Sequence, residues 1–300
     1  MSFFRYAGGK SKLREPILTK LGAICTPNCQ QYREPFFGGG SVGLNFLPSH
    51  GNWLFARNMS RVWINDKDIG IAHLWTSVIK FPRKLCEKVE QFTPSVQAFY
   101  DIKQELLEYS RTHTGNTLYD FYEADERILD IGFKKLVLHQ ISYSGLGTKS
   151  GGPLGGAEQK SKYGIGCRWS PSHICKRIEA IHVAFKRFSV RQDKCTSVDF
   201  QELIENTDFL ACIYLDPPYF VKGNVLYQEG FTLEDHKRLA TALQSTKHCW
   251  LLSYDDCPEV RELYKWASIE SIDVNYSIAG NKKDGKTIAR TKPELLIWRK

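Results

Sequence analysis

The sequence FLACIYLDPPY occupies residues 209–219 and decides which fold is expected. Its first seven residues are apolar, as in a strand that is buried on both faces of a parallel sheet. The run stops at Asp216, and the two prolines after it have no N–H group with which to continue a sheet ladder. The pattern predicts a central strand that carries Asp216 to its carboxyl end, where open α/β sheets bind their ligands.

The tetrapeptide Asp216-Pro217-Pro218-Tyr219 also suits one kind of chemistry. A carboxylate and the Pro217 carbonyl can accept both N–H donors of an exocyclic amine, which directs the lone pair of the amine at an electrophile. Tyr219 can stack on the flat base that carries the amine. Asp-Pro alone is a plain turn in many proteins, but the whole tetrapeptide after an apolar strand favours Asp216, Pro217 and Tyr219 as catalytic residues.

Residues 34–41, with the sequence EPFFGGGS, form a second signal, because glycines permit a close backbone approach to a ligand. With Val42 and Gly43 they also fit the G-x-G-x-x-G pattern of dinucleotide-binding proteins. Residues 29–33 are too polar for the buried strand that this pattern requires. A methyl donor, which is one electrophile that an amine can attack, needs a similar close backbone approach to its amino-acid and ribose parts. Asp66, which follows a later strand, can accept from ribose hydroxyls in either interpretation.

The N-terminal sequence YAGGK, residues 6–10, is a third glycine-containing motif. Gly9-Lys10-Ser11 looks like the end of a phosphate-binding P-loop, but Phe4 stands where that loop requires a glycine. ATP hydrolysis is therefore not expected. From these residues alone, Lys10 is either a surface lysine or a ligand contact, and Tyr6 is either a core residue or a ligand contact.

Hydrophobic periodicity predicts an α/β fold with a mainly helical insert. The expected strands are 53–56, 61–64, 209–215, 250–254 and 294–298. The expected helices are 42–47, 69–79, 96–107, 128–139, 172–188 and 232–244, the last with Thr232 as its N-cap. We assign residues 1–80 and 195–300 to one domain and residues 81–194 to an inserted domain that contains a long glycine-rich loop at 143–170.

Positive charge is concentrated in one segment. The chain has a formal net charge of +8, yet residues 134–194 contain 12 Lys and Arg against 3 Asp and Glu, so the remainder is close to neutral. Such a patch is either a solvated face or a surface that contacts phosphates, and its glycine-rich loop favours the second. The candidate phosphate or groove contacts are Tyr143, Lys149, Lys160, Lys162 and Arg168, with Lys282, Lys283 and Lys286 in a basic hairpin near the C-terminus.

Several classes of protein are not expected from this sequence. No apolar run approaches the roughly 20 residues of a membrane helix, and the N-terminus lacks the apolar segment of a secretory signal. The nine cysteines include no C-x-x-C pair, and no nearby His pair completes a zinc site. These features predict a cytoplasmic protein with free thiols, no membrane contact and no metal.

Five motifs, in this order, resemble the Dam-like (D12 class) family of N6-adenine DNA methyltransferases. They are residues 6–10, 34–36, 66, 199–200 and 216–219, with further marks at 142–147 and 152–156, at 231–232 and 235–236, and at 294–297. The resemblance covers nearly the whole chain. It implies a Rossmann-like methyltransferase fold with a mixed central sheet, and an adenine-specific enzyme that uses S-adenosylmethionine. It also implies that the helical insert, 81–194, is the target-recognition domain for double-stranded DNA.

The resemblance further implies roles for single residues. The implied cofactor contacts are Tyr6, Lys10, Glu34, Phe36, Gly38, Gly40, Ser41, Asp66, Asp199, Phe200 and Asp216. Among them, Asp66 matches the acid that binds ribose, Phe200 the residue against the adenine of the donor, and Asp216 a position that faces both donor and target base. Transfer is expected to be direct and in line, without a metal, to an adenine flipped out of the duplex by a monomer or weak dimer.

Two other functions stay open at this point: N-methylation of RNA or protein, and DNA binding by a relative without activity. The basic segment disfavours a protein substrate, and the intact motifs disfavour a loss of activity. The sequence leaves open the recognised DNA site and the preference for unmethylated or half-methylated DNA. It also leaves open whether the role lies in restriction-modification, in replication and mismatch repair, or in phage self-protection, and so whether the compartment is a bacterial or a phage host's cytoplasm.

Overall fold

The computed structural model describes eight stretches of the chain. They are residues 3–6, 8–10, 12–46, 59–113, 125–186, 194–220, 231–283 and 286–299. For residues 194, 274–283 and 286–292 only the backbone is described. The predicted strand 53–56 lies outside the described residues.

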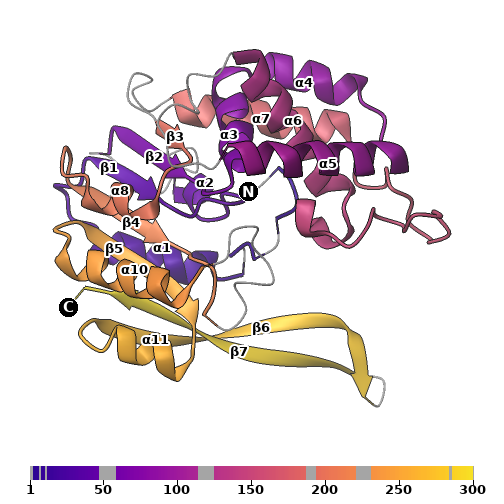
Figure 1. Cartoon of the computed structure of the whole chain (residues 1–300). Helices are drawn as coiled ribbons and strands as arrows, with labels where there is room; N and C mark the ends of the chain where they lie inside the picture. Colours follow the sequence, from indigo (N-terminus) through magenta and orange to yellow (C-terminus); the bar gives the residue numbers. More distant parts are fainter. Residues whose placement is uncertain are drawn as a thin grey trace.

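A seven-stranded mixed sheet forms the centre of the protein (Figure 1). Its order is β3-β2-β1-β4-β5-β7-β6, with β1 to β5 parallel and β7 antiparallel to both β5 and β6. The predicted α/β fold with a mixed sheet is confirmed. The strands are β1 Gln31–Glu34, β2 Arg61–Asn65, β3 Lys194–Thr196, β4 Ala211–Leu215, β5 Cys249–Asp255, β6 Ser268–Lys283 and β7 Lys286–Trp298.

Helices cover both faces of this sheet, as a buried parallel sheet requires. Along β4, Cys212 and Tyr214 face the core formed with α1 and α3, whereas Ala211, Ile213 and Leu215 face the core formed with α8 and α10. The helices are α1 Arg14–Ile24, α2 Gly43–Phe46, α3 Ile69–Lys80, α4 Pro82–Gln91, α5 Val96–Thr112, α6 Asp125–Ile141, α7 Pro171–Lys186, α8 Phe200–Glu205, α10 Leu233–Ser245 and α11 Pro258–Leu263.

Local sequence explains where the important helices begin. Thr232 caps α10, because its hydroxyl accepts from the Asp235 amide while the Asp235 carboxylate accepts from the Thr232 amide, which confirms the predicted N-cap. Asp68 caps α3 by accepting from the amides of Gly70 and Ile71. Both caps lie at the carboxyl edge of the sheet and so help to shape that edge.

Helices α4 to α7 lie together beside the sheet and pack on α3 (Figure 1). The close approach of α3 and α6 depends on Gly132, since a Cβ atom there would lie 2.6 Å from the Ser77 hydroxyl. The predicted helices at 69–79, 96–107, 128–139 and 172–188 correspond to α3, α5, α6 and α7. Between α6 and α7, residues 143–170 contain only two short 3₁₀ turns, Tyr143–Gly145 and Gly147–Lys149.

The C-terminal hairpin is longer than predicted. The sequence indicated a hairpin from residue 277, but β6 already begins at Ser268. The sequence does not signal a strand there, because Ile269 and Ile272 are separated by two polar residues and alternation begins only at Ile272. Pairing with β7, itself held by β5, extends the strand over these residues.

Candidate active site

The carboxyl ends of β1 and β4 lie side by side at the centre of the sheet. The chain continues from β1 toward β2 on one side and from β4 toward β5 on the other, so this is the point where the strand order reverses. A cavity of about 390 Å³ opens there. Glu34 and Phe36 reach it from the end of β1, and Asp216 reaches it from the end of β4.

Strand β1 corrects one sequence interpretation. The sequence pattern of residues 29–33 predicts no buried strand because these residues are polar, yet all four residues of β1 are buried. Their polar groups are satisfied within the protein: the Arg33 guanidinium donates to Gln31 Oε1 at 2.8 Å and to the Leu203 carbonyl at 2.6 Å, and Tyr32 Oη donates to Glu34 at 2.6 Å. A buried strand can therefore be polar when each group finds a partner.

Glu34 ends β1 as a buried acid beside the cavity. Burial raises the pKa of its carboxyl well above the ordinary range, the Tyr32 hydroxyl opposes the shift, and the charge of Asp216 adds to it. The glycine turn that follows holds its shape through positive φ angles at Gly38 and Gly40. At Gly38 an added Cβ atom would lie only 2.6 Å from the Tyr6 ring, so this glycine also allows Tyr6 to pack on the turn.

Asp66 fixes the glycine turn from the end of β2. Its carboxylate accepts from the Gly38 amide at 2.8 Å and from the Asp68 amide at 3.0 Å. Burial, reinforced by the charge of Asp68, raises the pKa of Asp66 to about 7. The group is thus a hydrogen-bond acceptor at the rim of the cavity that changes its protonation near neutral pH.

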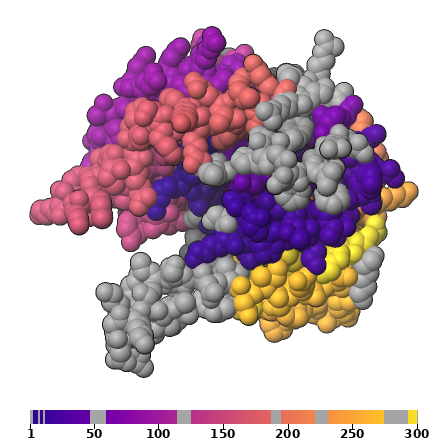
Figure 2. All heavy atoms as spheres, turned by 180° about the vertical axis from the view of Figure 1, so that it is seen from behind, coloured from indigo at the N-terminus to yellow at the C-terminus, as the bar shows by residue number. Residues whose placement is uncertain are grey.

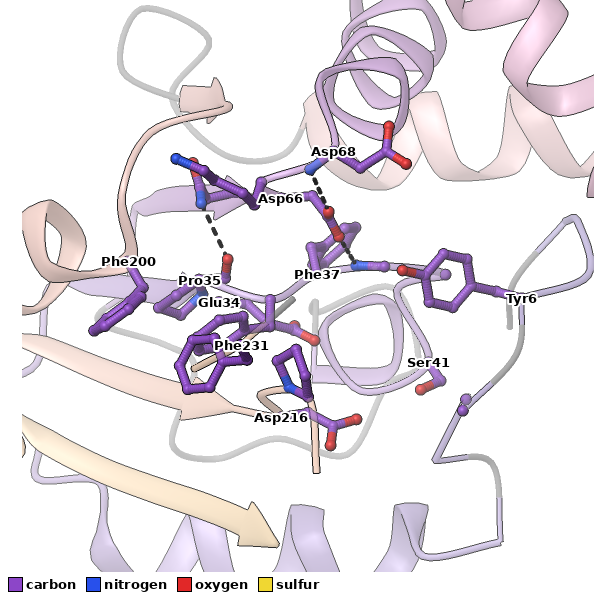
Figure 3. Close-up of a pocket in the computed structure, with 18 of the residues that line it drawn as sticks. Tyr6, Glu34, Pro35, Phe37, Ser41, Asp66, Asp68, Phe200, Asp216 and Phe231 are labelled. Carbon is purple, nitrogen blue, oxygen red and sulfur yellow. Dashed lines mark hydrogen bonds between the residues drawn. The ribbon is translucent and has the colours of Figure 1, made fainter. Parts of the chain in front are cut away.

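One end of the cavity is aromatic. The rings of Phe36, Phe200 and Phe231 lie with centroids 5.6–5.8 Å apart, a spacing typical of paired aromatic rings. Arg238 lies over the Phe200 ring at 5.0 Å and pairs with Asp199 at 2.8 Å. Figure 3 shows Phe200 and Phe231 at this end, Tyr6 and Ser41 at the other, and Asp66 and Asp216 on facing sides between them.

A second cluster of polar side chains, besides Asp66 and its partners, is centred on Asp216. Lys10 Nζ lies 2.7 Å from its Oδ1, and Ser253 Oγ donates to the same oxygen at 3.2 Å. Burial raises the pKa of Asp216, whereas the Lys10 ammonium lowers it. Lys10 also lies 4.4 Å from the centre of the Tyr219 ring, and its amide donates to Ser41 Oγ at 2.9 Å. The N-terminal motif is thereby joined to both ligand-facing loops.

Helix α6 contributes residues that the sequence reasoning missed. Lys135 on α6 is buried and pairs with Asp68 at 2.5 Å. One turn later, His139 stacks on Tyr6 with centroids 5.5 Å apart, and burial, reinforced by the Lys135 charge, lowers its pKa to about 4. Both line the cavity. The sequence signal that could have predicted them is a lysine and a histidine four residues apart in an apolar helix. Such residues lie on one helix face and are rarely buried without a partner.

The structure brings most of the sequence-predicted cofactor residues together. Those that line the cavity are Tyr6, Glu34, Phe36, Gly38, Ser41, Asp66, Asp199, Phe200 and Asp216. The other predicted cofactor and catalytic residues do not line it: Lys10 pairs with Asp216 and lies over the Tyr219 ring, Pro217 follows Asp216 in the chain, and Gly40 supports the turn through its hydrogen bond to the Phe37 carbonyl. The sequence reasoning gave no cavity role to Phe231 or Arg238, which also line the cavity.

A comparison with known protein families identifies the family of this chain. The model of the D12 class N6 adenine-specific DNA methyltransferase family matches residues 6–278. The chain belongs to this family. A comparison with curated proteins gives no match.

As a D12 class enzyme, the protein methylates the N6 position of adenine in DNA and uses S-adenosylmethionine. The cavity fits this donor by its chemistry. Its aromatic end suits a purine, and Asp66 suits the hydroxyls of a ribose. Within the described ranges, no group of three or more His, Cys, Asp and Glu side chains is placed to hold a metal ion.

The predicted DNA contacts of this D12 class enzyme fall at different places. Lys149 lines the cavity. Tyr143, Lys160, Lys162 and Arg168 are exposed, Tyr143 to 64% of its surface, and Lys160 pairs with Glu158. In Figure 2 the pink part of the 143–170 segment projects from the helical layer. The side chains of Lys282, Lys283 and Lys286 lie outside the described residues.

Part of the basic segment is neutralised. Lys134 pairs with Glu105 and Asp130, and Lys135 pairs with Asp68, so these two lysines of the segment are not available to phosphates.

The described helices include none that is long and apolar enough to cross a membrane.

Proposed function

We propose that Asp216 and the Pro217 carbonyl hold the N6 amine of an adenine flipped out of double-stranded DNA, while Tyr219 stacks on the base. What supports this proposal is the position of Asp216, which ends the central strand and faces the same cavity as Asp66 and the aromatic end. Both N–H donors of the amine are then engaged, so its lone pair points at the methyl group. S-adenosylmethionine supplies that methyl group from its sulfonium.

The donor site extends along the cavity in this proposal. The adenine of the donor lies between Phe36, Phe200 and Phe231, and Asp66 accepts from the ribose hydroxyls. Tyr6 and Lys10 hold the amino-acid end, where Ser41 is hydrogen-bonded to the Lys10 amide. These places follow the polarity of the cavity, apolar at one end and charged at the other, and they bring donor and target base together at Asp216.

We assign DNA recognition to the inserted domain, residues 81–194, and catalysis to residues 1–80 and 195–300. The support is the position of the exposed residues Tyr143, Lys162 and Arg168 on the glycine-rich segment that follows α6, a helix whose Lys135 and His139 line the cavity. A surface of this kind holds the phosphate backbone and reads bases in a groove. Lys149, Lys160, Lys282 and Lys283 complete the proposed set.

We also propose that the enzyme works in the cytoplasm, as a monomer or a weak dimer on DNA. One chain supplies the aromatic, acidic and glycine parts of the cavity, so the site does not depend on a second copy. All nine cysteines are free, as in a reducing compartment.

The test of these roles compares Asp216→Ala with the wild type in three measurements: methyl transfer to DNA, DNA affinity and donor affinity. We expect transfer to fall about 100-fold or more, since a charged hydrogen bond and the alignment of the amine are lost, while DNA affinity stays within about twofold. Glu262→Ala, which removes an exposed acid on the surface, is the matched control and retains activity. Equal activity of Asp216→Ala and wild type would remove Asp216 from the proposed site.

A further inference from the structure

Glu294 is a buried acid for which the proposed mechanism has no use. It lies on β7 opposite Asp255 of β5 and is 3% exposed. Its carboxylate accepts a hydrogen bond of 2.6 Å from the Tyr219 hydroxyl. Burying a carboxylate is costly unless it is paired, so a burial next to the proposed base-stacking ring calls for a reason.

Lys10 connects Glu294 to the reacting group. Its ammonium lies 2.7 Å from Asp216, 3.9 Å from Glu294 and 4.4 Å from the centre of the Tyr219 ring. One cation thus serves two carboxylates, and it is placed closer to Asp216. When the N6 amine of adenine donates to Asp216, the carboxylate accepts it with lone pairs that Lys10 does not use, and Glu294 is a second partner that keeps the Lys10 ammonium beside Asp216.

We propose that Glu294 is a positioning residue for methyl transfer, which fixes the plane of the Tyr219 ring and holds Lys10 in place while Asp216 engages the target amine. This inference rests on the proposed function, because it assumes that Asp216 and Tyr219 receive the base. Glu294 itself contacts neither the base nor the donor in this arrangement; it acts through the two side chains that do.

A purely structural role predicts a different pattern. Glu294 is followed on β7 by the buried residues Leu295 and Leu296, so a structural role would mean that its substitution loosens the hairpin. Loosening would lower the melting temperature and affect donor and DNA binding alike. A positioning role instead lowers the rate of the chemical step, leaves donor affinity unchanged, and depends on the Tyr219 hydroxyl.

The experiment uses Glu294→Gln, Tyr219→Phe and the double variant in the full chain. Glu294→Gln keeps an acceptor of the same size but removes the charge, and Tyr219→Phe keeps the ring but removes the hydroxyl. Glu270→Gln is the matched control, since Glu270 belongs to the neighbouring strand β6 and pairs with Lys20 at the surface. Single-turnover transfer, donor affinity by calorimetry and emission from 2-aminopurine in place of the target adenine are measured for each variant.

We expect each single variant to lower the single-turnover rate about tenfold, because each weakens a hydrogen bond to a charged group. The double variant should be about as slow as the slower single variant, since both changes act on one contact. Donor affinity should stay within about twofold of the wild-type value. The emission of 2-aminopurine in the protein–DNA complex should move toward that of the free duplex, because the extruded base is held less firmly.

Two results would overturn the inference: rate losses that multiply in the double variant, or rates within about twofold of wild type for both single variants. If Glu294→Gln fails to fold, Tyr219→Phe decides alone by the same criterion. Failure of the proposed function is a separate result, because an active Asp216→Ala variant would contradict that function whatever Glu294 does.

Discussion

The Lys10 ammonium and the Asp216 carboxylate lie 2.7 Å apart and join the first motif of the chain to the end of its central strand. The pair is nearly buried, with side-chain exposures of 6% and 14%. Burial raises the pKa of Asp216, and Lys10 is the largest opposing influence. Lys10 therefore helps to keep Asp216 ionised, the form in which it can accept from an amine.

Replacing Lys10 by methionine should shift the pH dependence of the enzyme. The apolar substitute leaves Asp216 buried without its cation, so the pKa of Asp216 rises further and a smaller fraction is ionised at a given pH. We expect the acid limb of the pH profile of kcat/KM to move to higher pH by about one unit or more, with activity recovering as the pH is raised. A uniform loss at every pH, with an unmoved limb, would contradict this role for Lys10.

Donor binding should depend on pH through Asp66. Because the pKa of Asp66 is raised to about 7, its carboxylate is a minor species at pH 6 and the major one at pH 8. We expect calorimetry to show donor affinity rising about tenfold between these values, and Asp66→Asn to bind more weakly without that dependence. Because its pKa is raised in the folded state, Asp66 contributes most to the free energy of unfolding at low pH. This contribution is lost as the pH rises through about 7.

The glycine turn should not tolerate a side chain at Gly38. Alanine there would adopt a positive φ angle of 48° and place its Cβ atom 2.6 Å from the Tyr6 ring. We expect Gly38→Ala to lower the free energy of unfolding by about 1–3 kcal/mol and to weaken donor binding, because Tyr6 must move. The control is Gly151→Ala, whose added Cβ atom meets no heavy atom within 4 Å. Equal denaturation curves for the two variants would show that the turn is not constrained in this way.

The salt dependence of DNA binding tests the glycine-rich segment. Lys162 and Arg168 are exposed on it, whereas Lys265 is an exposed cation on another part of the chain and pairs with Glu262. If the first two contact phosphates, alanine at either should lower the slope of log affinity against log salt by about 0.9. Lys265→Ala should leave the slope as it is. Unchanged slopes for all three would place the DNA elsewhere.

The sequence predicted the parts of the protein in which one physical rule dominates. An apolar run ending in two prolines can hardly be anything but a buried strand with its end at the sheet edge, and β4 with Asp216 is found there. The cap of α10 at Thr232 is equally local. The signal for each of these features lies in residues that are neighbours in the chain.

The prediction failed where partners from distant segments decide. Strand β1 looked too polar to be buried because the groups that satisfy Arg33, such as the Leu203 carbonyl, lie far away along the chain. Lys135 and His139 looked like ordinary helix residues until Asp68 and Tyr6 were placed against them. Phe231 precedes the amphipathic helix α10 and Arg238 lies in it. Only the packing of α10 near α8 brings these two residues to Phe200.

The most direct measurement is the transfer of labelled methyl from S-adenosylmethionine to unmethylated DNA by wild type and Asp216→Ala, with the modified bases mapped along the product. We expect the wild type to place label in N6-methyladenine at one short sequence, which also gives the recognised site. We expect Asp216→Ala to place almost none while still binding the DNA. Absence of label in DNA with the wild type, or equal label with both proteins, would contradict the assignment of Asp216 as the residue that holds the target amine.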